Sequence, residues 1–211
     1  DDKKVKWSGG RIVFALTFLV TTVYFGQGLR KYGNVPMLSG FLPPQWYSIY
    51  EYDNECPLGL NCFHDLEEGI AFAKENNKPI LIDFTGYACV NCRKMEEHVW
   101  PKDEIFSIIN EEYVLVSLYV DDKEALRLEE QYISSTTGQK VRTIGNKWSD
   151  LQSSQFGTNA QPYYVLIAPD GKVLNQPRAY TPDVDEYRGF LECGLETFEN
   201  IDKLAMKGNA D

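Results

Sequence analysis

Two cysteines three positions apart, Cys89 and Cys92, follow an apolar run that ends at Phe84. The pattern predicts a strand that leads into a helix whose first turn carries both thiols. Backbone N–H groups and the helix dipole stabilise an anion at a helix N-terminus, so Cys89 is favoured as a thiolate. Cys92 lies one turn further on and can close a disulfide with Cys89. The spacing indicates dithiol–disulfide chemistry, with Cys89 as the nucleophile and Cys92 as the resolving thiol.

Zinc binding and a pair of inert core thiols are the alternatives for these two cysteines. A structural zinc site needs about four ligands. The chain has only two histidines, His64 and His98, and Cys56 and Cys62 are far from the pair in sequence. The strand–turn–helix context favours redox chemistry, without a metal and without an organic cofactor.

Two carboxylates flank the cysteines in the sequence. Asp83 ends the apolar strand, so we expect it to be buried, with a raised pKa, and able to take the proton of Cys92 as that thiol attacks. The alternative is a hydrogen-bonded turn carboxylate. Glu96 follows Cys92 by one turn on the same helix face, which predicts that it lies near the cysteines and modulates them. Its alternative is a surface charge, like that of Glu97.

The pattern around the cysteines predicts a single α/β domain with a mixed sheet. A helix capped by Asp65, with Glu68 three residues later, precedes the strand at 79–84. The remaining expected elements are helices at 89–99 and 104–110, a strand at 113–120, a helix at 124–132, a polar loop at 134–147 that could turn as a hairpin at Gly138, a helix at 148–156, a strand at 163–168 with a hairpin turn at 169–172, and a closing helix at 183–204.

An uncharged run of 18 residues, 12–29, lies between Arg11 and Arg30. As a helix it would be about 27 Å long, close to the ~30 Å hydrocarbon core of a membrane. The basic residues before it predict a cytoplasmic N-terminus. A signal-like segment and a soluble amphipathic helix are the alternatives. We therefore divide the chain into an apolar, membrane-spanning helix with its flanks (1–32), a linker rich in proline and aromatic residues (33–61) and the α/β domain (62–211).

Charge and cysteine usage limit the classes of function. The net charge is −10, and no basic patch with interleaved aromatic residues is present, so a nucleic-acid partner is not expected. Five cysteines are too few and too scattered for a disulfide scaffold. Cys193 falls among apolar residues of the closing helix and is predicted to be a buried free thiol. Pairing of Cys56 with Cys62 stays open.

The order of elements, with Cys-x-x-Cys after the first core strand, resembles the thioredoxin fold. Asp83 stands six residues before Cys89, where thioredoxins keep a buried acid, and residues 159–165 resemble the thioredoxin cis-proline loop. Residues 84–96, FTGYACVNCRKME, are most similar to the C-terminal periplasmic domains of the DsbD family of thiol:disulfide interchange proteins. The resemblance implies a cis bond before Pro162, which would free the backbone of Gln161 for a substrate strand. It also places Tyr87 at the rim of the site, unless that ring simply packs.

The same resemblance implies a protein-disulfide reductase that takes electrons from a membrane donor domain. It would pass them to periplasmic thioredoxin-like or disulfide-bearing proteins, including those of cytochrome c biogenesis, from a site at the bacterial inner membrane. The chain departs from thioredoxin itself at Ala88, Val90 and Asn91, where thioredoxin has Trp, Gly and Pro. A stand-alone, membrane-tethered oxidase or isomerase is one alternative, and a metal carrier or binding module without catalytic activity is another.

Overall fold

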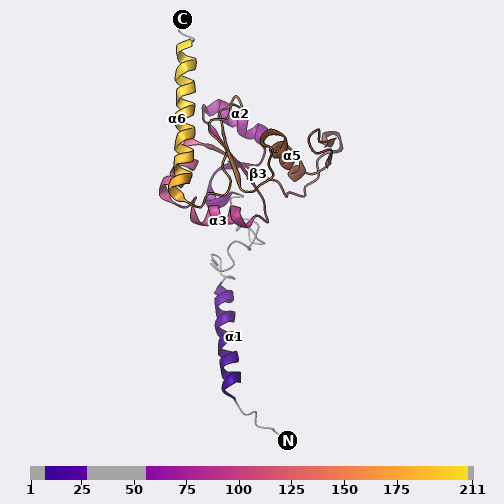
Figure 1. Ribbon diagram of the computed structural model, residues 1–211, viewed down its shortest axis with the longest axis vertical. Helices are drawn as coiled ribbons and strands as arrows, with labels where there is room; N and C mark the ends of the chain where they lie inside the picture. The colour runs from indigo at the N-terminus through magenta and orange to yellow at the C-terminus, as the bar shows by residue number, and fades with distance from the viewer. Residues whose placement is uncertain (1–7, 28–55, 209–211) are drawn as a thin grey trace. The chain divides into compact units, whose positions relative to one another are not determined.

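The computed structural model describes residues 8–27 and 56–208 of the chain, which divides into two compact units, Asp1–Leu42 and Pro43–Asp211. Figure 1 shows the elements of both units. The predicted linker falls mostly on residues 33–55, outside the described part. The described elements of the second unit are η2 (Pro57–Gly59), β1 (Cys62–Phe63), α2 (Leu66–Asn76), β2 (Ile80–Thr85), α3 (Val90–His98), α4 (Asp103–Ser107), η3 (Ile108–Glu112), β3 (Val114–Tyr119), η4 (Leu128–Glu130), β4 (Tyr132–Ile133), β5 (Lys140–Val141), α5 (Ile144–Phe156), β6 (Tyr163–Ile167) and α6 (Val184–Gly208).

The first unit contains one described helix, α1 (Gly9–Gln27). Its apolar side chains are exposed, Phe14 by 74% and Phe18 by 66%. The hydroxyl groups of Thr17, Thr21 and Thr22 donate to carbonyl oxygens four residues earlier, within the helix itself. Within residues 8–27 and 56–208, no helix combines the length and the apolar character needed to cross a membrane. The predicted helix is therefore present, whereas the predicted membrane span is not confirmed.

A four-stranded mixed sheet forms the centre of the second unit, in the order β1-β3-β2-β6. Strands β1, β3 and β2 run parallel, and β6 runs antiparallel to β2. Every residue of β2 and β3 is buried, which is the pattern of strands covered on both faces. The predicted α/β class and mixed sheet are confirmed.

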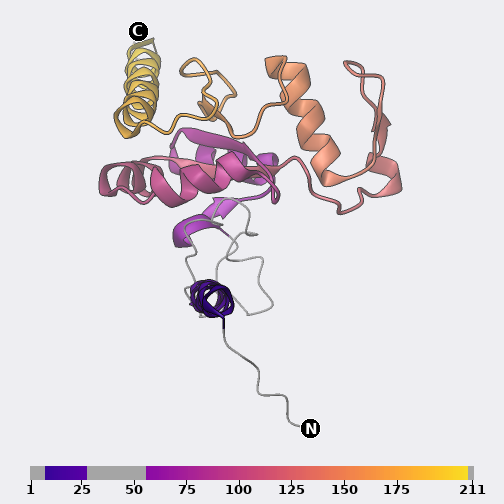
Figure 2. The same cartoon turned by 60° about the horizontal axis from the view of Figure 1, so that its bottom comes forward.

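Helices cover both faces of this sheet, because alternate residues along each strand point to opposite sides. On one face, Leu81, Leu115 and Leu166 pack against α3, α4 and α6. On the other face, Ile82 and Val116 pack against α2 and α5. Figures 1 and 2 show α6 and α5 on opposite sides of the domain.

The register of the strands brings two loops to one edge of the sheet. The parallel strands β3 and β2 both end at this edge, with Thr85 opposite Tyr119. The antiparallel strand β6 begins there, because Tyr163 pairs with Phe84, near the end of β2. The loop that carries Cys89 and the loop that carries Pro162 therefore lie at the same edge.

Local sequence signals set several element boundaries as predicted. The carboxylate of Asp65 accepts N–H bonds from Glu67 and Glu68 and caps α2. Residues 169–172 form the predicted turn, in which the Ala168 N–H donates to the Lys172 carbonyl at 2.8 Å. A hairpin of β4 and β5, with Gly138 at a positive φ of 69°, projects beside α5 (Figure 2).

The predicted helix at 124–132 is wrong. This segment instead pairs with residues 142–144, through bonds from the Leu126 N–H to the Arg142 carbonyl and from the Ile144 N–H to the Glu124 carbonyl. It contains only the short turn η4 before β4. Leu128 is 84% exposed, so the segment has no continuous apolar face that a helix would bury. The next helix, α5, begins four residues earlier than predicted, at Ile144, capped by Thr143.

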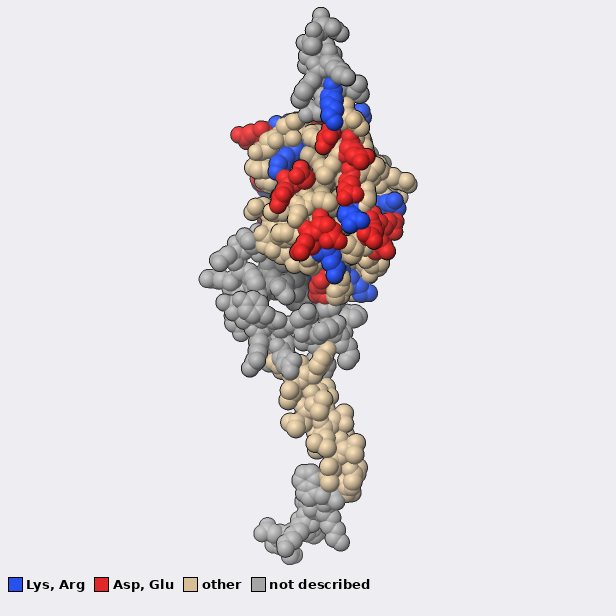
Figure 3. All heavy atoms as spheres, turned by 90° about the vertical axis from the view of Figure 1, so that its left-hand side faces the viewer, with Lys and Arg blue, Asp and Glu red and all other residues tan. Residues whose placement is uncertain are grey.

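The prediction that Cys193 is buried is also wrong, because its thiol is exposed. Tyr187, Phe190, Leu191 and Gly194 form the buried stripe of α6, and Cys193 lies outside that stripe. Acidic and basic side chains gather on the face that carries α6 (Figure 3). They include several ion pairs one helical turn apart: Arg188–Asp185, Arg188–Glu192 and Lys203–Glu199.

Candidate active site

Cys89 and Cys92 are joined by a disulfide at the start of α3. Cys89 is the N-cap residue, and its Sγ accepts the N–H of Cys92 at 3.2 Å. This bond and the helix dipole favour a thiolate at Cys89 once the disulfide is reduced. Cys89 is partly buried, whereas Cys92 is only 1% exposed. The predicted pairing is confirmed, and the predicted difference in exposure is present.

The loop before Cys89 is held by a residue that sequence reasoning missed. The two carboxylate oxygens of Asp121 accept the backbone N–H groups of Tyr87 and Ala88 at 2.9 and 3.0 Å. Gly86 leaves room for this contact, because a Cβ there would lie 3.1 Å from the Asp121 carboxyl group. The ring of Tyr87 stacks on Tyr119 with 4.2 Å between centroids. Asp121 therefore fixes the backbone that presents Cys89, and Tyr87 packs beside it.

We expect Asp121→Ala to lower stability by about 1–2 kcal/mol, because two charge-assisted hydrogen bonds are lost at a partly hydrated loop. Asp121→Asn keeps one acceptor oxygen and should lose about half as much. Urea unfolding measures both values, and the rate of thiol–disulfide exchange should fall severalfold in the same order. Unchanged stability in both variants would show that the two bonds do not hold the loop.

A charged cluster lies buried on the α3 side of the sheet. Asp83, Arg93 and Glu96 are 2%, 4% and 7% exposed. Arg93 pairs with Glu96 at 2.6 Å and also donates to the Thr85 hydroxyl at 3.4 Å. Glu96 is therefore not a surface charge, and the alternative proposed for it is wrong. Sequence reasoning missed Arg93. Its position directly after Cys92, on a helix that packs against the sheet, could have indicated a buried charge.

Burial raises the pKa of Asp83 to about 7, and the Arg93 guanidinium only partly offsets this effect. Burial also raises the pKa of Glu96 well above its ordinary value, against the opposing charge of Arg93 and with a further contribution from Asp83. Two carboxyl groups thus share a single guanidinium, and low-dielectric surroundings disfavour a second negative charge. The expected burial and raised pKa of Asp83 are confirmed. Its role as the proton acceptor of Cys92 stays a prediction.

The loop before β6 contains a cis peptide bond between Gln161 and Pro162, as the resemblance predicted. The β2–β6 ladder begins at Tyr163, so the backbone of Gln161 lies outside it. Gln152 of α5, which is fully buried, donates to the Ala160 carbonyl at 2.8 Å and accepts from the Gln161 side chain at 3.0 Å. Gln152 is a second residue that sequence reasoning missed, and it fixes this loop.

A second disulfide joins Cys56 to Cys62, which answers the pairing left open by the sequence. His64 lies beside it, and one donor atom from each of the three residues lies within 4.8 Å of the others. Among residues 8–27 and 56–208, these three side chains form the one group of histidine, cysteine or acidic residues close enough together to hold a metal ion. In the disulfide state the two sulfur atoms cannot act as thiolate ligands.

The sequence profile of the thioredoxin-like domain matches residues 66–192, which include both cysteines of α3 and the cis-proline loop. The chain belongs to the thioredoxin-like domain family. Membership and the Cys89–Cys92 disulfide together support a thiol–disulfide oxidoreductase. A comparison with curated proteins gives no significant match.

Solved structures similar to this thioredoxin-like chain include "DsbH Oxidoreductase", with 18% identity, coverage of 71% of this chain and 95% of the other, and a TM-score of 0.47. A thioredoxin from Thermus thermophilus has 14% identity, coverage of 62% and 84%, and a TM-score of 0.44. A disulphide isomerase from Xylella fastidiosa Temecula1 has 15% identity, coverage of 72% and 95%, and a TM-score of 0.39.

Proposed function

We propose that this thioredoxin-like chain is a protein-disulfide reductase that transfers electrons by thiol–disulfide exchange. The observation that carries the proposal is the asymmetry of the pair at α3. Cys89 caps the helix, accepts a backbone N–H and is partly accessible, whereas Cys92 is buried. Such a pair has one sulfur that a folded substrate reaches and one that acts only within the chain.

The reaction starts from the reduced pair. The Cys89 thiolate attacks one sulfur of a substrate disulfide, a mixed disulfide forms, and the other substrate sulfur leaves with the electron pair. Cys92 then loses its proton and attacks Cys89 Sγ, which releases the second substrate thiolate and closes Cys89–Cys92. Two electrons pass to the substrate, and the chain returns to the disulfide state seen here. Asp83, with a pKa of about 7, is the proposed acceptor of the Cys92 proton.

Substrate recognition is proposed at the cis-proline loop. Gln161 lies outside the β2–β6 ladder and at the same edge of the sheet as the Cys89 loop. An extended substrate segment can pair with backbone groups that no neighbouring strand uses. Gln152 holds the loop from α5 and so keeps its backbone in position without contacting the substrate.

We propose that electrons reach Cys89 and Cys92 from a membrane-bound donor and pass to periplasmic disulfide-bearing proteins, as in the DsbD family. The exposed apolar side chains of α1 support a contact with other apolar helices, and its threonine hydroxyls are satisfied within the helix. In this arrangement α1 packs among the donor's helices at the inner membrane, and the thioredoxin-like domain lies in the periplasm.

The reduction potential of the Cys89–Cys92 pair tests the proposed direction of transfer. The full chain is equilibrated against a graded dithiothreitol buffer, and its free thiols are trapped. The reduction potential should lie nearer about −270 mV, typical of reductants with this fold, than about −120 mV, typical of oxidants. The reduced chain should also reduce a disulfide-bonded protein such as insulin. A value near −120 mV would instead favour an oxidase, and no exchange at all would favour a binding module.

A further inference from the structure

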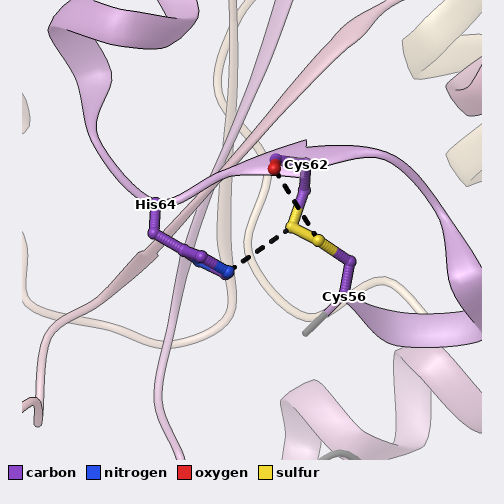
Figure 4. A group of neighbouring side chains, drawn as sticks. All are labelled: Cys56, Cys62 and His64. Carbon is purple, nitrogen blue, oxygen red and sulfur yellow. Dashed lines mark hydrogen bonds between the residues drawn. A yellow bond between two sulfur atoms is a disulfide. The ribbon is translucent and has the colours of Figure 1, made fainter. Parts of the chain in front are cut away.

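A second disulfide, Cys56–Cys62, plays no part in the reductase mechanism, yet its surroundings are those of a reactive pair. It closes a short loop that contains η2 and ends on the edge strand β1. Both sulfur-bearing residues are only partly buried, as is His64, two positions after Cys62. Figure 4 shows the imidazole of His64 directed at the sulfur of Cys62.

The contacts of His64 settle which ring nitrogen faces the sulfur. His64 Nδ1 lies 3.3 Å from the carbonyl oxygen of Ser117, and Nε2 lies 3.8 Å from Cys62 Sγ. A carbonyl oxygen can only accept a hydrogen bond, so Nδ1 carries a proton. The neutral ring therefore presents an unprotonated Nε2 to the sulfur, and the protonated ring presents an N–H. Tyr119 packs against the ring with 5.6 Å between centroids and helps to hold this orientation.

We propose that Cys56 and Cys62 form a second thiol–disulfide exchange site, reduced by dithiols, in which His64 stabilises Cys62 as the leaving thiolate. A histidine beside a cysteine sulfur is a recurring way to favour a thiolate. In thiol–disulfide exchange, the sulfur that is better stabilised as a thiolate leaves faster. The incoming thiolate therefore attacks Cys56, not Cys62.

The reaction balances with one dithiol. Its first thiol loses its proton and attacks Cys56 Sγ, the Cys56–Cys62 bond breaks, and the electron pair stays on Cys62 Sγ, which takes up a proton shared with the neighbouring Nε2 of His64 at 3.8 Å. The second thiol of the reductant then attacks its own first sulfur in the mixed disulfide and releases Cys56, which takes up that thiol's proton. The dithiol becomes a disulfide, and the Cys56–Cys62 pair gains two electrons and two protons, one of them held between Cys62 and His64.

Among the described residues, the pair borders open hollows. Two hollows of about 600 and 450 Å³ meet here, and the lining of both includes Cys62, Phe63 and His64. Cys56 lines the larger hollow, together with the polar side chains of Asn61 and Lys78. A small dithiol can therefore reach the sulfur that it must attack.

The test isolates this pair in the full chain by the substitutions Cys89→Ser, Cys92→Ser and Cys193→Ala. Reduction by dithiothreitol is followed by quenching with iodoacetamide and mass spectrometry of the peptide that holds Cys56 and Cys62. We expect His64→Gln to slow the reduction about tenfold, because the leaving sulfur of Cys62 loses the imidazole nitrogen that faces it at 3.8 Å. His98→Gln, at the other histidine of the chain, which is exposed on α3, is the matched control and should react at the unaltered rate.

Equal rates for His64→Gln and His98→Gln would overturn the proposal, as would a disulfide that dithiothreitol leaves intact in the folded chain. A second measurement needs no substitution at His64. After reduction in the presence of a chelator, limiting iodoacetamide should label Cys62 before Cys56. Equal labelling, or labelling of Cys56 first, would contradict the assigned roles. Stoichiometric zinc that protects both thiols without a chelator would also overturn the proposal in favour of a metal site.

Discussion

Cys92→Ser should convert a transient mixed disulfide into a stable covalent adduct between this chain and its substrate. Cys89 remains partly accessible at the N-terminus of α3 in this variant and can still attack, but no second thiol can resolve the product. Cys89→Ser should form little or no adduct and should lower the exchange rate by roughly a thousandfold or more, because the nucleophile is lost. A non-reducing gel of both variants, incubated with a disulfide-bonded protein, shows the difference directly.

The control for this experiment is Cys193→Ser, which removes the exposed thiol of α6 and should behave like the unaltered chain. A reductant should cleave the mixed disulfide formed by Cys92→Ser completely. Equal amounts of adduct from the two variants of the α3 pair, or more from Cys89→Ser, would reverse the assigned roles. In that case the buried sulfur would be the nucleophile, and the mechanism proposed for this family member would not hold.

Asp83→Asn should slow the resolution of the mixed disulfide by roughly a hundredfold at pH 7, the size expected for the loss of a general base. The attack of Cys89 should change little. Stopped-flow measurement separates the two steps, because attack consumes substrate disulfide and resolution releases the second thiol. Glu97→Gln is the control, since Glu97 is an exposed carboxylate on α3, the helix that carries Cys92. Equal slowing of both steps would point to a general structural effect.

The pH dependence of the stability of Asp83→Asn gives an independent test of the raised pKa of Asp83. The pKa of Asp83 is about 7 in the folded chain, above its ordinary value of 3.8, so the folded state binds more protons than the unfolded state between these values. Stability should therefore fall as pH rises from about 4 to about 7. Asp83→Asn removes this penalty and should be more stable than the unaltered chain above pH 7, by up to about 4 kcal/mol at ~1.36 kcal/mol per pKa unit, because the pKa of about 7 already includes the attraction to Arg93. The difference should vanish near pH 4, and a stability gain that does not depend on pH would contradict the raised pKa.

Local pattern was enough to predict the order of strands and helices around the cysteines, because each signal involves residues close in sequence. The apolar run that forms β2, the capping carboxylate of Asp65 and the Cys-x-x-Cys spacing all act within one or two turns of chain. The Cys89–Cys92 disulfide and the buried Asp83 follow from the same short stretch. The sequence pattern gave a wrong prediction at residues 124–132, where a helix competes with extended backbone. There, hydrogen bonds to residues 142–144 replace the predicted helix.

Tertiary structure decided which distant residues complete the site. Asp121 reaches Tyr87 and Ala88 only because β2 and β3 pair in parallel, with Thr85 opposite Tyr119, so that both strands end at one edge. The burial of Glu96 with Arg93 depends on the face that α3 turns to the sheet. His64 meets Cys62 because the Ser117 carbonyl on β3 holds its ring. These contacts arise from strand register and packing between elements, and neither quantity is encoded in any single stretch of residues.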